Sequence, residues 1–508
     1  MNIKQAKQEI KNTLHAYLAK DPLGNYLIPP VRQRPILLMG PPGVGKTQIM
    51  EQIAAETGVG LVAYTITHHT RQSAVGLPFI EKRTYGGKEY SVTEYTMSEI
   101  LASVYTLMEK TGLREGILFL DEINCVSETL APMMLQFLQC KTFGNQRLPE
   151  GWLIAAAGNP PEYNRSVRDF DVVTLDRVKR IDVREDFAVW KEYARAKGLH
   201  GAVVSYLDIK KENFYRVETT AEGIQFATAR GWEDLSELLT VYETLGLKAD
   251  REVVGQYIQL PRIARDFANY LELYHKYQNV YHVDEILKGS WRPVTVRELR
   301  AAPFDEKLSV MGLVLSRLSE AARETRRQDA LCERLHTALT AFKESLAAGQ
   351  DPREVLEALA RERREALKRA RDAGQLEKRR QTLAQLEINA LEDYRRRLVQ
   401  EAEPGEAMEL VRGWFGAEVE QRASLAGEAK AELDHAFAFL EETFGQGQEL
   451  VLFVTELTAG PDTSWFIEQF GCDAYFRHNR ELLFDDTRHR IREEIMAAKA
   501  AEQEEDHD

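Results

Sequence analysis

The segment Gly40–Thr47 constrains the fold of this chain more than any other stretch. It reads GPPGVGKT, follows the apolar run Ile36–Met39 and precedes residues that favour a helix. Glycines let a backbone adopt positive φ and approach phosphate oxygens closely, and the free N–H groups of a helix start attract anions. A G-x-x-x-x-G-K-[ST] pattern between a strand and a helix predicts a phosphate-binding loop. A glycine turn beside a surface lysine is the other interpretation of the segment taken alone.

The loop also supplies candidate contacts to a nucleotide and its metal ion. Lys46 is placed to reach the β- and γ-phosphates, and the Thr47 hydroxyl is placed to hold Mg²⁺. The full set of candidate nucleotide-binding residues is Gly40, Pro41, Pro42, Gly43, Val44, Gly45, Lys46, Thr47 and Gln48.

A second apolar run, Gly116–Leu120, ends in the two carboxylates Asp121 and Glu122. This pattern is typical of a central strand whose carboxyl end lies beside the phosphate loop. Asp121 is then expected near the metal, and Glu122 is placed to activate a water molecule for attack on the γ-phosphate. Adjacent acids after a strand can also form a solvated turn.

A third apolar run, Leu153–Ala157, leads into Gly158 and Asn159. The Asn159 amide can donate to the γ-phosphate or orient the attacking water, because it is an uncharged donor with two N–H groups. An ordinary turn after a strand is the alternative.

Together these motifs resemble those of AAA+ ATPases, and most closely the MoxR family, a branch related to magnesium chelatase and dynein-type modules. The resemblance covers about the first 290 residues and is carried, in the family order, by GPPGVGKT, ILFLDEIN, AAAGNPPEYN, LDRVKRIDV and FATARGWEDLSELL. It implies an α/β fold, with a P-loop core built on a parallel sheet and an α-helical lid.

The resemblance also implies a role for each matching residue. Thr47 and Asp121 would serve the metal, Glu122 would be the base and Asn159 would be sensor 1. Arg230, in FATARGW, would be sensor 2. The implied cofactors are ATP and Mg²⁺.

Arg177, in LDR, would be an arginine finger that reaches the site of a neighbouring subunit, with Arg180 as the alternative. A finger supplied in trans neutralises transition-state charge and makes hydrolysis depend on assembly. A surface ion pair is the other interpretation of either arginine.

The function implied by the resemblance is Mg²⁺-dependent ATP hydrolysis in a homo-oligomeric ring, expected to be a hexamer. The ring would remodel or mature a protein client together with a partner that carries a von Willebrand A domain. A nucleotide-gated scaffold, with slow hydrolysis as a timer, remains the alternative, and a DNA-linked motor is a third possibility.

Between the first two motifs, apolar residues on both sides of Gly86–Gly87 predict a β-hairpin. In the family such a hairpin is inserted in the second helix of the core and contacts partners or substrate, although a passive edge decoration is equally open. His68 and His69 precede it, and a polar loop explains them better than a metal site because no third ligand has suitable spacing.

Net charge, cysteine spacing and apolar run length indicate which partners and which cellular compartment to expect. The 508 residues carry a net charge of −14, which argues against nucleic-acid binding because such affinity comes mainly from phosphate neutralisation. The four cysteines are scattered without C-x-x-C spacing, as expected of a reducing cytoplasm. No run of 18 apolar residues is present, so we expect no membrane association.

Four domains are expected along the chain. They are a nucleotide-binding α/β core with an N-terminal helix (1–188), a helical lid (189–291), a charged helical arm (292–445) and a small C-terminal α/β unit with an acidic tail (446–508).

Within the arm, Asp351 and Pro352 should cap and begin one helix. The basic run of residues 361–380 is interleaved with glutamates and favours a solvated helical face. QELVLFVTEL, near the end, is interpreted as a strand. Tyr26 and Ile28 are candidates for adenine contact, although packing on the core explains them equally well.

Overall fold

The computed structural model describes residues 1–68, 74, 76–143, 146–163, 167, 170–220, 223–375, 377–401 and 406–480. His69 and the acidic tail, for which the sequence analysis makes predictions, lie outside the described residues, as does the side chain of His68. The chain divides into two compact units. The first holds Met1–Val189, Thr228–Arg230 and Ala338–Ala407, and the second holds the described residues of Trp190–Ala227, Gly231–Thr337 and Met408–Asp508.

The first unit is built on a five-stranded sheet in the order β2-β5-β8-β1-β9. All four pairings in it are parallel. Its strands are β1 (Ile36–Met39), β2 (Gly60–Thr65), β5 (Gly116–Asp121), β8 (Trp152–Gly158) and β9 (Lys179–Asp182). The three apolar runs of the sequence motifs therefore form β1, β5 and β8, the three central strands. Because the strands are parallel, their carboxyl ends share one edge of the sheet, where the motif residues follow.

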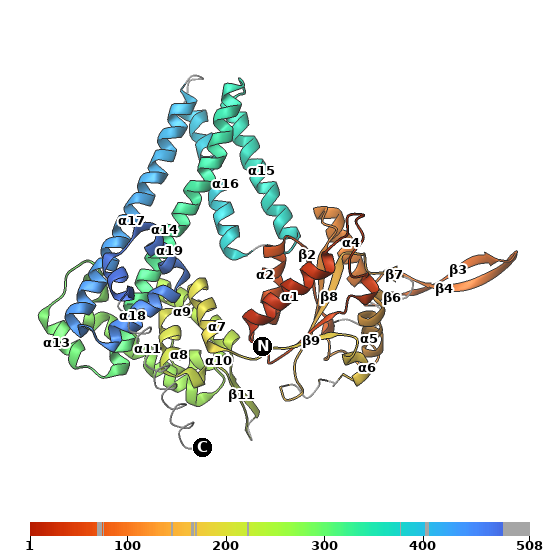
Figure 1. The fold of residues 1–508 in the computed structure, drawn as a ribbon, viewed down its shortest axis with the longest axis horizontal. Helices are drawn as coiled ribbons and strands as arrows, with labels where there is room; N and C mark the ends of the chain where they lie inside the picture. Colours follow the sequence, from red (N-terminus) through yellow and green to blue (C-terminus); the bar gives the residue numbers. More distant parts are fainter. Residues whose placement is uncertain are drawn as a thin grey trace, which may run out of the picture. The chain divides into compact units, whose positions relative to one another are not determined.

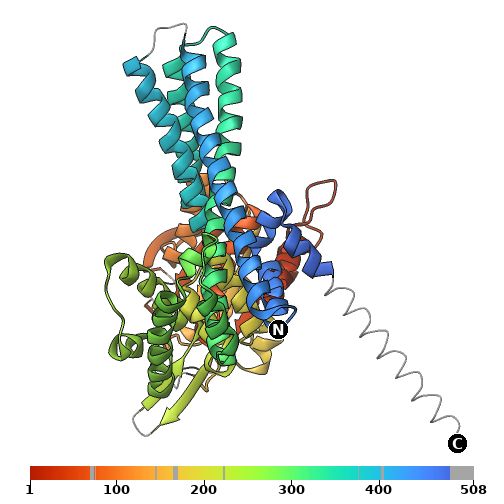
Figure 2. The same cartoon turned by 90° about the vertical axis from the view of Figure 1, so that its left-hand side faces the viewer.

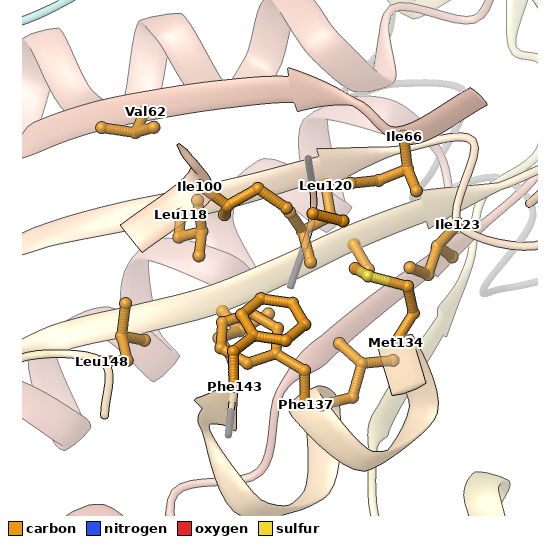
Figure 3. Packing of buried hydrophobic residues seen from close by; sticks show 14 of the residues in the cluster. Val62, Ile66, Ile100, Leu118, Leu120, Ile123, Met134, Phe137, Phe143 and Leu148 are labelled. Carbon is orange, nitrogen blue, oxygen red and sulfur yellow. The ribbon is translucent and has the colours of Figure 1, made fainter. Parts of the chain in front are cut away.

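Alternation along these buried strands divides the core into two layers. Leu37, Leu118 and Ile154 face a cluster with α4 (Glu99–Thr111) and α5 (Ala131–Cys140). Figure 3 shows part of this cluster, in which the rings of Phe137 and Phe143 stack at 3.9 Å between centroids. The neighbouring strand residues, including Leu38 and Phe119, face α1 (Ile3–Leu18) and α2 (Lys46–Thr57) instead. A central parallel sheet needs such cover on both faces.

The predicted hairpin is present as β3 (Pro78–Tyr85) and β4 (Lys88–Tyr95), which pair antiparallel around Gly86–Gly87. It extends away from the sheet (Figure 1), and every residue of β3 is exposed. The shorter elements of this unit are η1 (Pro30–Arg32), η2 (Ile66–His68), β6 (Thr142–Phe143), β7 (Gln146–Arg147) and α6 (Val172–Leu175).

The arm contributes α15 (Pro352–Asp372) and α16 (Lys378–Glu401) to the first unit. They form an antiparallel helical pair (Figures 1 and 2). As predicted, the Asp351 side chain caps α15 and Pro352 is its first residue. The arginines of the basic run pair with glutamates of α16, as in Arg363–Glu387 at 2.8 Å and Arg364–Glu392 at 3.1 Å. Most residues of the run within α15 are exposed, as expected of a solvated face, although Glu387 is buried.

The second unit is mainly helical, with one β-hairpin that the sequence analysis did not predict. The hairpin is formed by β10 (Arg216–Thr220) and β11 (Gly223–Ala227). In the core of the second unit, Trp232 packs against Tyr206 and Phe267, with ring centroids 5.7 and 5.3 Å away. The helical elements are α8 (Gly201–Ile209), η3 (Lys211–Asn213), α10 (Arg251–Tyr257), α11 (Pro261–Tyr281), α12 (Val283–Leu287), α13 (Pro293–Ala301), α18 (Gln448–Ala459) and α19 (Pro461–Phe470).

Four further helices include residues of both units: α7 (Phe187–Lys197), α9 (Ala229–Leu245), α14 (Phe304–Ala347) and α17 (Ala407–Phe444). Contacts group residues 338–407 with the nucleotide-loop unit rather than with the rest of the arm. The four linear domains drawn from the sequence remain a prediction.

The strand predicted for QELVLFVTEL is wrong, because these residues lie in helix α18. Leu450, Phe453, Val454 and Leu457 are its buried residues, and their i, i+3, i+4, i+7 spacing is helical. The described part of the C-terminal region is helical, so it is not an α/β unit. Within the described residues, no helix is both long and apolar enough to cross a bilayer.

Candidate functional site

The loop between β1 and α2 has the backbone geometry that its glycines predict. Gly43 and Gly45 have φ of 77° and 90°, values that L side chains rarely adopt. Gly45 caps α2, so the helix begins at Lys46 with its N–H groups directed at the loop. Gln48, also predicted to contact nucleotide, is exposed on the first turn of α2.

Lys46 is the buried cation of the site. Its Nζ donates to the carbonyl oxygens of Gly40 (2.7 Å) and Pro41 (2.8 Å) and to Oδ1 of Asn159 (2.8 Å). Burial lowers the pKa of Lys46 to about 8, while Asp121 raises that pKa and Arg230 lowers it further. A desolvated ammonium held by neutral oxygens is stabilised by an incoming anion, so the residues fit a polyphosphate.

Thr47 and Asp121 meet beside this lysine. The Thr47 hydroxyl donates to Asp121 Oδ2 at 2.8 Å, which brings a hydroxyl and a carboxylate oxygen together at the end of β5. Among the described side chains, no group of three or more His, Cys, Asp or Glu residues could hold a metal ion. Mg²⁺ usually takes one or two protein oxygens and completes its shell with water and substrate phosphates, so this pair fits a nucleotide-bound Mg²⁺.

Glu122 follows Asp121 in a strained backbone conformation. Its φ is 56°, one of three positive values among the described non-glycine residues. The Glu122 N–H donates to Asp121 Oδ1 at 2.9 Å, and the Thr67 hydroxyl donates to Glu122 Oε2 at 3.1 Å. Strained residues cluster where the surrounding structure fixes a functional side chain. Thr67, just beyond β2, therefore holds the carboxylate of the predicted base.

The backbone of Asn159 is held by two hydrogen bonds with the Asn124 side chain. The Asn124 Nδ2 donates to the Asn159 carbonyl at 2.8 Å, and the Asn159 N–H donates to Asn124 Oδ1 at 3.3 Å. Asn124 is 3% exposed, and a Cβ at Gly158 would lie 2.7 Å from its Oδ1. Gly158 must therefore lack a side chain for Asn124 to reach this position. Asn159 in turn accepts from Lys46 through its side chain.

Arg230 also reaches the loop, within the first unit. A Cβ at Gly43 would lie 3.3 Å from the Thr228 Cβ and 3.4 Å from the Arg230 Cβ. The positive charge of Arg230 also contributes to lowering the pKa of Lys46. Lys46, Thr47, Asp121, Glu122, Asn159 and Arg230 are thus brought together at one edge of the sheet.

Arg177 and Arg180 are not part of this assembly. Met39, which precedes the phosphate loop, pairs with Asp182 at the carboxyl end of β9. Arg177 lies in the turn before β9, which begins at Lys179, so it is at the opposite end of the strand from the loop edge. The Arg177 guanidinium donates to the amide oxygen of Gln139, whereas Arg180 forms an ion pair with Asp182 at 2.9 Å. Both arginines are exposed.

Three polar residues at the site were missed by the sequence analysis: Thr67, Asn124 and Thr228. Thr67 and Asn124 each follow the carboxyl end of a strand of the sheet, and that position is the signal that could have identified them. Thr228 has no such signal, because only the fold brings it to Gly43. Tyr26 packs against Gly151, at the amino ends of the strands, so packing rather than adenine contact explains it.

Comparison with known proteins agrees with this geometry. Residues 36–175 match the AAA family, described as the ATPase family associated with various cellular activities. The chain carries an AAA ATPase domain. The match begins at β1 and ends with α6, so it includes the phosphate loop, Asp121, Glu122 and Asn159. No curated protein matches the sequence.

Solved structures with partial similarity include two bacterial proteins. One is a protein from Cytophaga hutchinsonii ATCC 33406 whose assignment as an ATPase is provisional, with 17% identity and a TM-score of 0.23 over 35% of this chain and 46% of that one. The other is NtrX from Brucella abortus in complex with ADP, with 17% identity and a TM-score of 0.24 over 40% of this chain and 44% of that one. The chain therefore spans less than half of either protein.

Proposed function

We propose that this protein is a Mg²⁺-dependent ATPase of the MoxR type. The observation that carries the proposal is the convergence of Lys46, the Thr47–Asp121 pair and Glu122 at one sheet edge. Lys46 and the N–H groups of the α2 start bind the phosphates, and Thr47 with Asp121 holds Mg²⁺. The metal supplies charge neutralisation at the phosphates when it is bound.

The other residues act on water and on the terminal phosphate. Glu122 takes the proton of the attacking water, and Asn159 positions that water or the γ-phosphate through its amide. Arg230 supplies positive charge from the other side of the loop, at Gly43. The hydrogen bond from Thr67 restrains the Glu122 carboxylate. A carboxylate held by such a bond is a weaker base, so we expect basal turnover to be slow.

Arg177 serves the nucleotide of a second copy of the chain. Its position at the amino end of β9 keeps it away from its own phosphate loop. Its hydrogen-bond partner Gln139 is neutral, whereas the carboxylate of Asp182 compensates the charge of Arg180. A guanidinium with a neutral hydrogen-bond partner keeps its full positive charge for a phosphate, whereas a guanidinium paired with a carboxylate does not. This difference favours Arg177 over Arg180 as the arginine finger.

The assembled form is a ring, taken as a hexamer, that works in the cytoplasm on a protein client with a von Willebrand A domain partner. The ring, partner and client follow from the resemblance to MoxR proteins. The exposed hairpin β3–β4 offers a surface for such contacts, because its Phe79 and Ile80 are 46% and 76% exposed.

The test is Glu122→Gln, which preserves the shape of the side chain and removes the base. We expect nucleotide affinity to be retained and turnover to fall by about 10² to 10⁴-fold, the usual contribution of a general base. Lys46→Ala, by contrast, should abolish nucleotide binding. Equal turnover in wild type and Glu122→Gln would contradict the assignment of the base.

The restraint of Glu122 by Thr67 also favours a second candidate, a nucleotide-gated scaffold in which slow hydrolysis is a timer. Partner capture by wild type with ATP, and equally by Glu122→Gln, would support the scaffold. If the protein remodels a client, and this remodelling is lost in Glu122→Gln, the result would support the ATP-driven remodelling function instead of the scaffold.

A further inference from the structure

The turn between α15 and α16 docks on the outer edge of the nucleotide-binding sheet. Strand β2 is the edge strand, and its outward polar groups face the arm. The Leu61 N–H donates to the Ala373 carbonyl at 3.1 Å, and Gln375 Nε2 donates to the Val59 carbonyl at 2.9 Å. Gly60, between them, donates inward to Glu115 instead, as expected of an alternating edge. The turn thus covers edge groups that would otherwise be open.

The contact is close because the turn contains a glycine. Gly374 has φ of 69°, and a Cβ there would lie 3.1 Å from the Leu61 carbonyl oxygen and 3.2 Å from the Leu61 Cβ. The neighbouring Ala373 is 2% exposed. Any larger residue at 374 would push the turn away from β2.

Arg380 extends the contact from β2 to α2. Its Nη1 donates to the Ala55 carbonyl at 3.3 Å, one of the last carbonyls of that helix. The last turn of α2 contains no basic residue of its own. A helix that binds an anion at its start is further stabilised by a cation at its end, because both interact favourably with the helix dipole. The arm supplies that cation.

Both contacted elements lead to the nucleotide site. α2 carries Lys46 and Thr47 at its start, nine residues before Ala55, or about 14 Å along the axis. β2 pairs in parallel with β5, and its Thr65 lies opposite Asp121, the proposed Mg²⁺ ligand. We propose that Gln375 and Arg380 are positioning residues, through which the arm holds α2 and β2 in register for phosphate binding and hydrolysis. This inference rests on the proposed ATPase function and deepens it.

Docking of the α15–α16 turn and binding of nucleotide must affect each other equally, because the two equilibria are thermodynamically linked. If docking of the turn improves nucleotide affinity, nucleotide must strengthen docking by the same factor. A merely structural contact would not respond to nucleotide. This separates positioning from packing in an experiment.

The test uses the full chain with Gly374→Val and a matched control, Gly349→Val. Both glycines lie in arm turns with positive φ, 69° and 82°, but a Cβ at Gly349 meets nothing within 4 Å. Arg380→Ala is compared in the same way with Arg361→Ala, an exposed arginine of α15, and with the rescue variant Arg380→Lys. Amide hydrogen exchange at Leu61, affinity for fluorescent ADP with Mg²⁺, and kcat and KM for ATP are measured for each.

We expect faster exchange at Leu61 and about a tenfold lower kcat/KM in Gly374→Val relative to Gly349→Val. Arg380→Ala should weaken ADP binding about two- to fivefold, the range of one charge at a helix terminus, and Arg380→Lys should restore most of it. In wild type, ADP should slow exchange at Leu61.

Faster exchange at Leu61 in Gly374→Val without any change in affinity or kcat/KM would overturn the inference, and so would exchange that ADP leaves unchanged. Unaltered exchange in Gly374→Val would refute the docking itself. A wild type that binds ADP but hydrolyses no ATP would refute the proposed function, while the ADP affinities and exchange rates would still decide this inference. A wild type that binds no nucleotide would refute both.

Discussion

The buried ammonium of Lys46 should take up a proton when nucleotide binds. Its pKa is about 8 in the structure because burial disfavours the charged form. Phosphate oxygens at the same place favour that form, so the pKa of Lys46 rises well above 9 in the complex. The bound state then holds more protons than the free state, and affinity must fall as pH rises through 8.

The size of the effect follows from the pKa. For a group of pKa about 8, proton uptake is about 0.1 per site at pH 7, about 0.5 at pH 8 and about 0.9 at pH 9. The apparent Kd then weakens about twofold from pH 7 to 8 and about fivefold from pH 8 to 9. Nucleotide phosphates contribute little in the upper part of this range, because their last pKa lies near 6.

Titration calorimetry of Mg²⁺–ADP binding in buffers of different ionisation enthalpy measures the uptake directly. Lys46→Arg is the control, since a guanidinium does not titrate below pH 12 and uptake should vanish wherever binding survives. A proton uptake near zero at pH 8 to 9 in wild type, with a flat Kd, would refute the burial argument for Lys46.

Three further outcomes are expected at the same site. Thr67→Val should raise basal kcat about threefold or more, since the hydrogen bond that restrains the charged Glu122 is lost; a lower kcat would show that Thr67 assists the base instead. Glu122→Gly and Glu122→Ala should both be inactive, but the glycine variant should be more stable to urea by about 1 kcal/mol because of the positive φ; equal midpoints would argue against strain. Asn124→Ala should lower kcat about tenfold and add nothing to Asn159→Ala, whereas additive losses in the double variant would mean that Asn124 acts independently.

The sequence predicted the central part of the fold because parallel buried strands leave a direct signature. β1, β5 and β8 are continuous apolar runs, each followed at its carboxyl end by polar motif residues. Glycine spacing identified the loop, and the parallel topology alone then brings Lys46, Asp121 and Asn159 together. The hairpin at Gly86–Gly87 was predicted for a similarly local reason, because two glycines supply the turn.

Other features depend on contacts that a local pattern does not contain. The apolar run in α18 is too short to distinguish strand from helix by composition, and its burial against a helical unit decided the outcome. Asn124 supports Asn159 from 35 residues away, and Gln375 meets Val59 across 316 residues. Thr228 comes next to Gly43 only through the fold. Such partners are set by tertiary packing rather than by propensity.

The choice of Arg177 as the arginine finger rests on both the family resemblance and the geometry. The sequence left the choice between Arg177 and Arg180 open, and both residues are exposed. Their different hydrogen-bond partners, Gln139 and Asp182, provide a physical reason to prefer Arg177.

The most direct test of the shared-site ring is the ATPase rate of Arg177→Ala mixed with Glu122→Gln, each of which should be inactive alone. In a randomly mixed ring at equal ratio, a quarter of the interfaces combine an intact Glu122 with an intact Arg177 from the neighbour, so about a quarter of wild-type activity should return. The wild-type rate per chain should also rise cooperatively with protein concentration. An Arg177→Ala variant as active as wild type, with a rate per chain independent of concentration, would contradict the account and indicate a self-contained site.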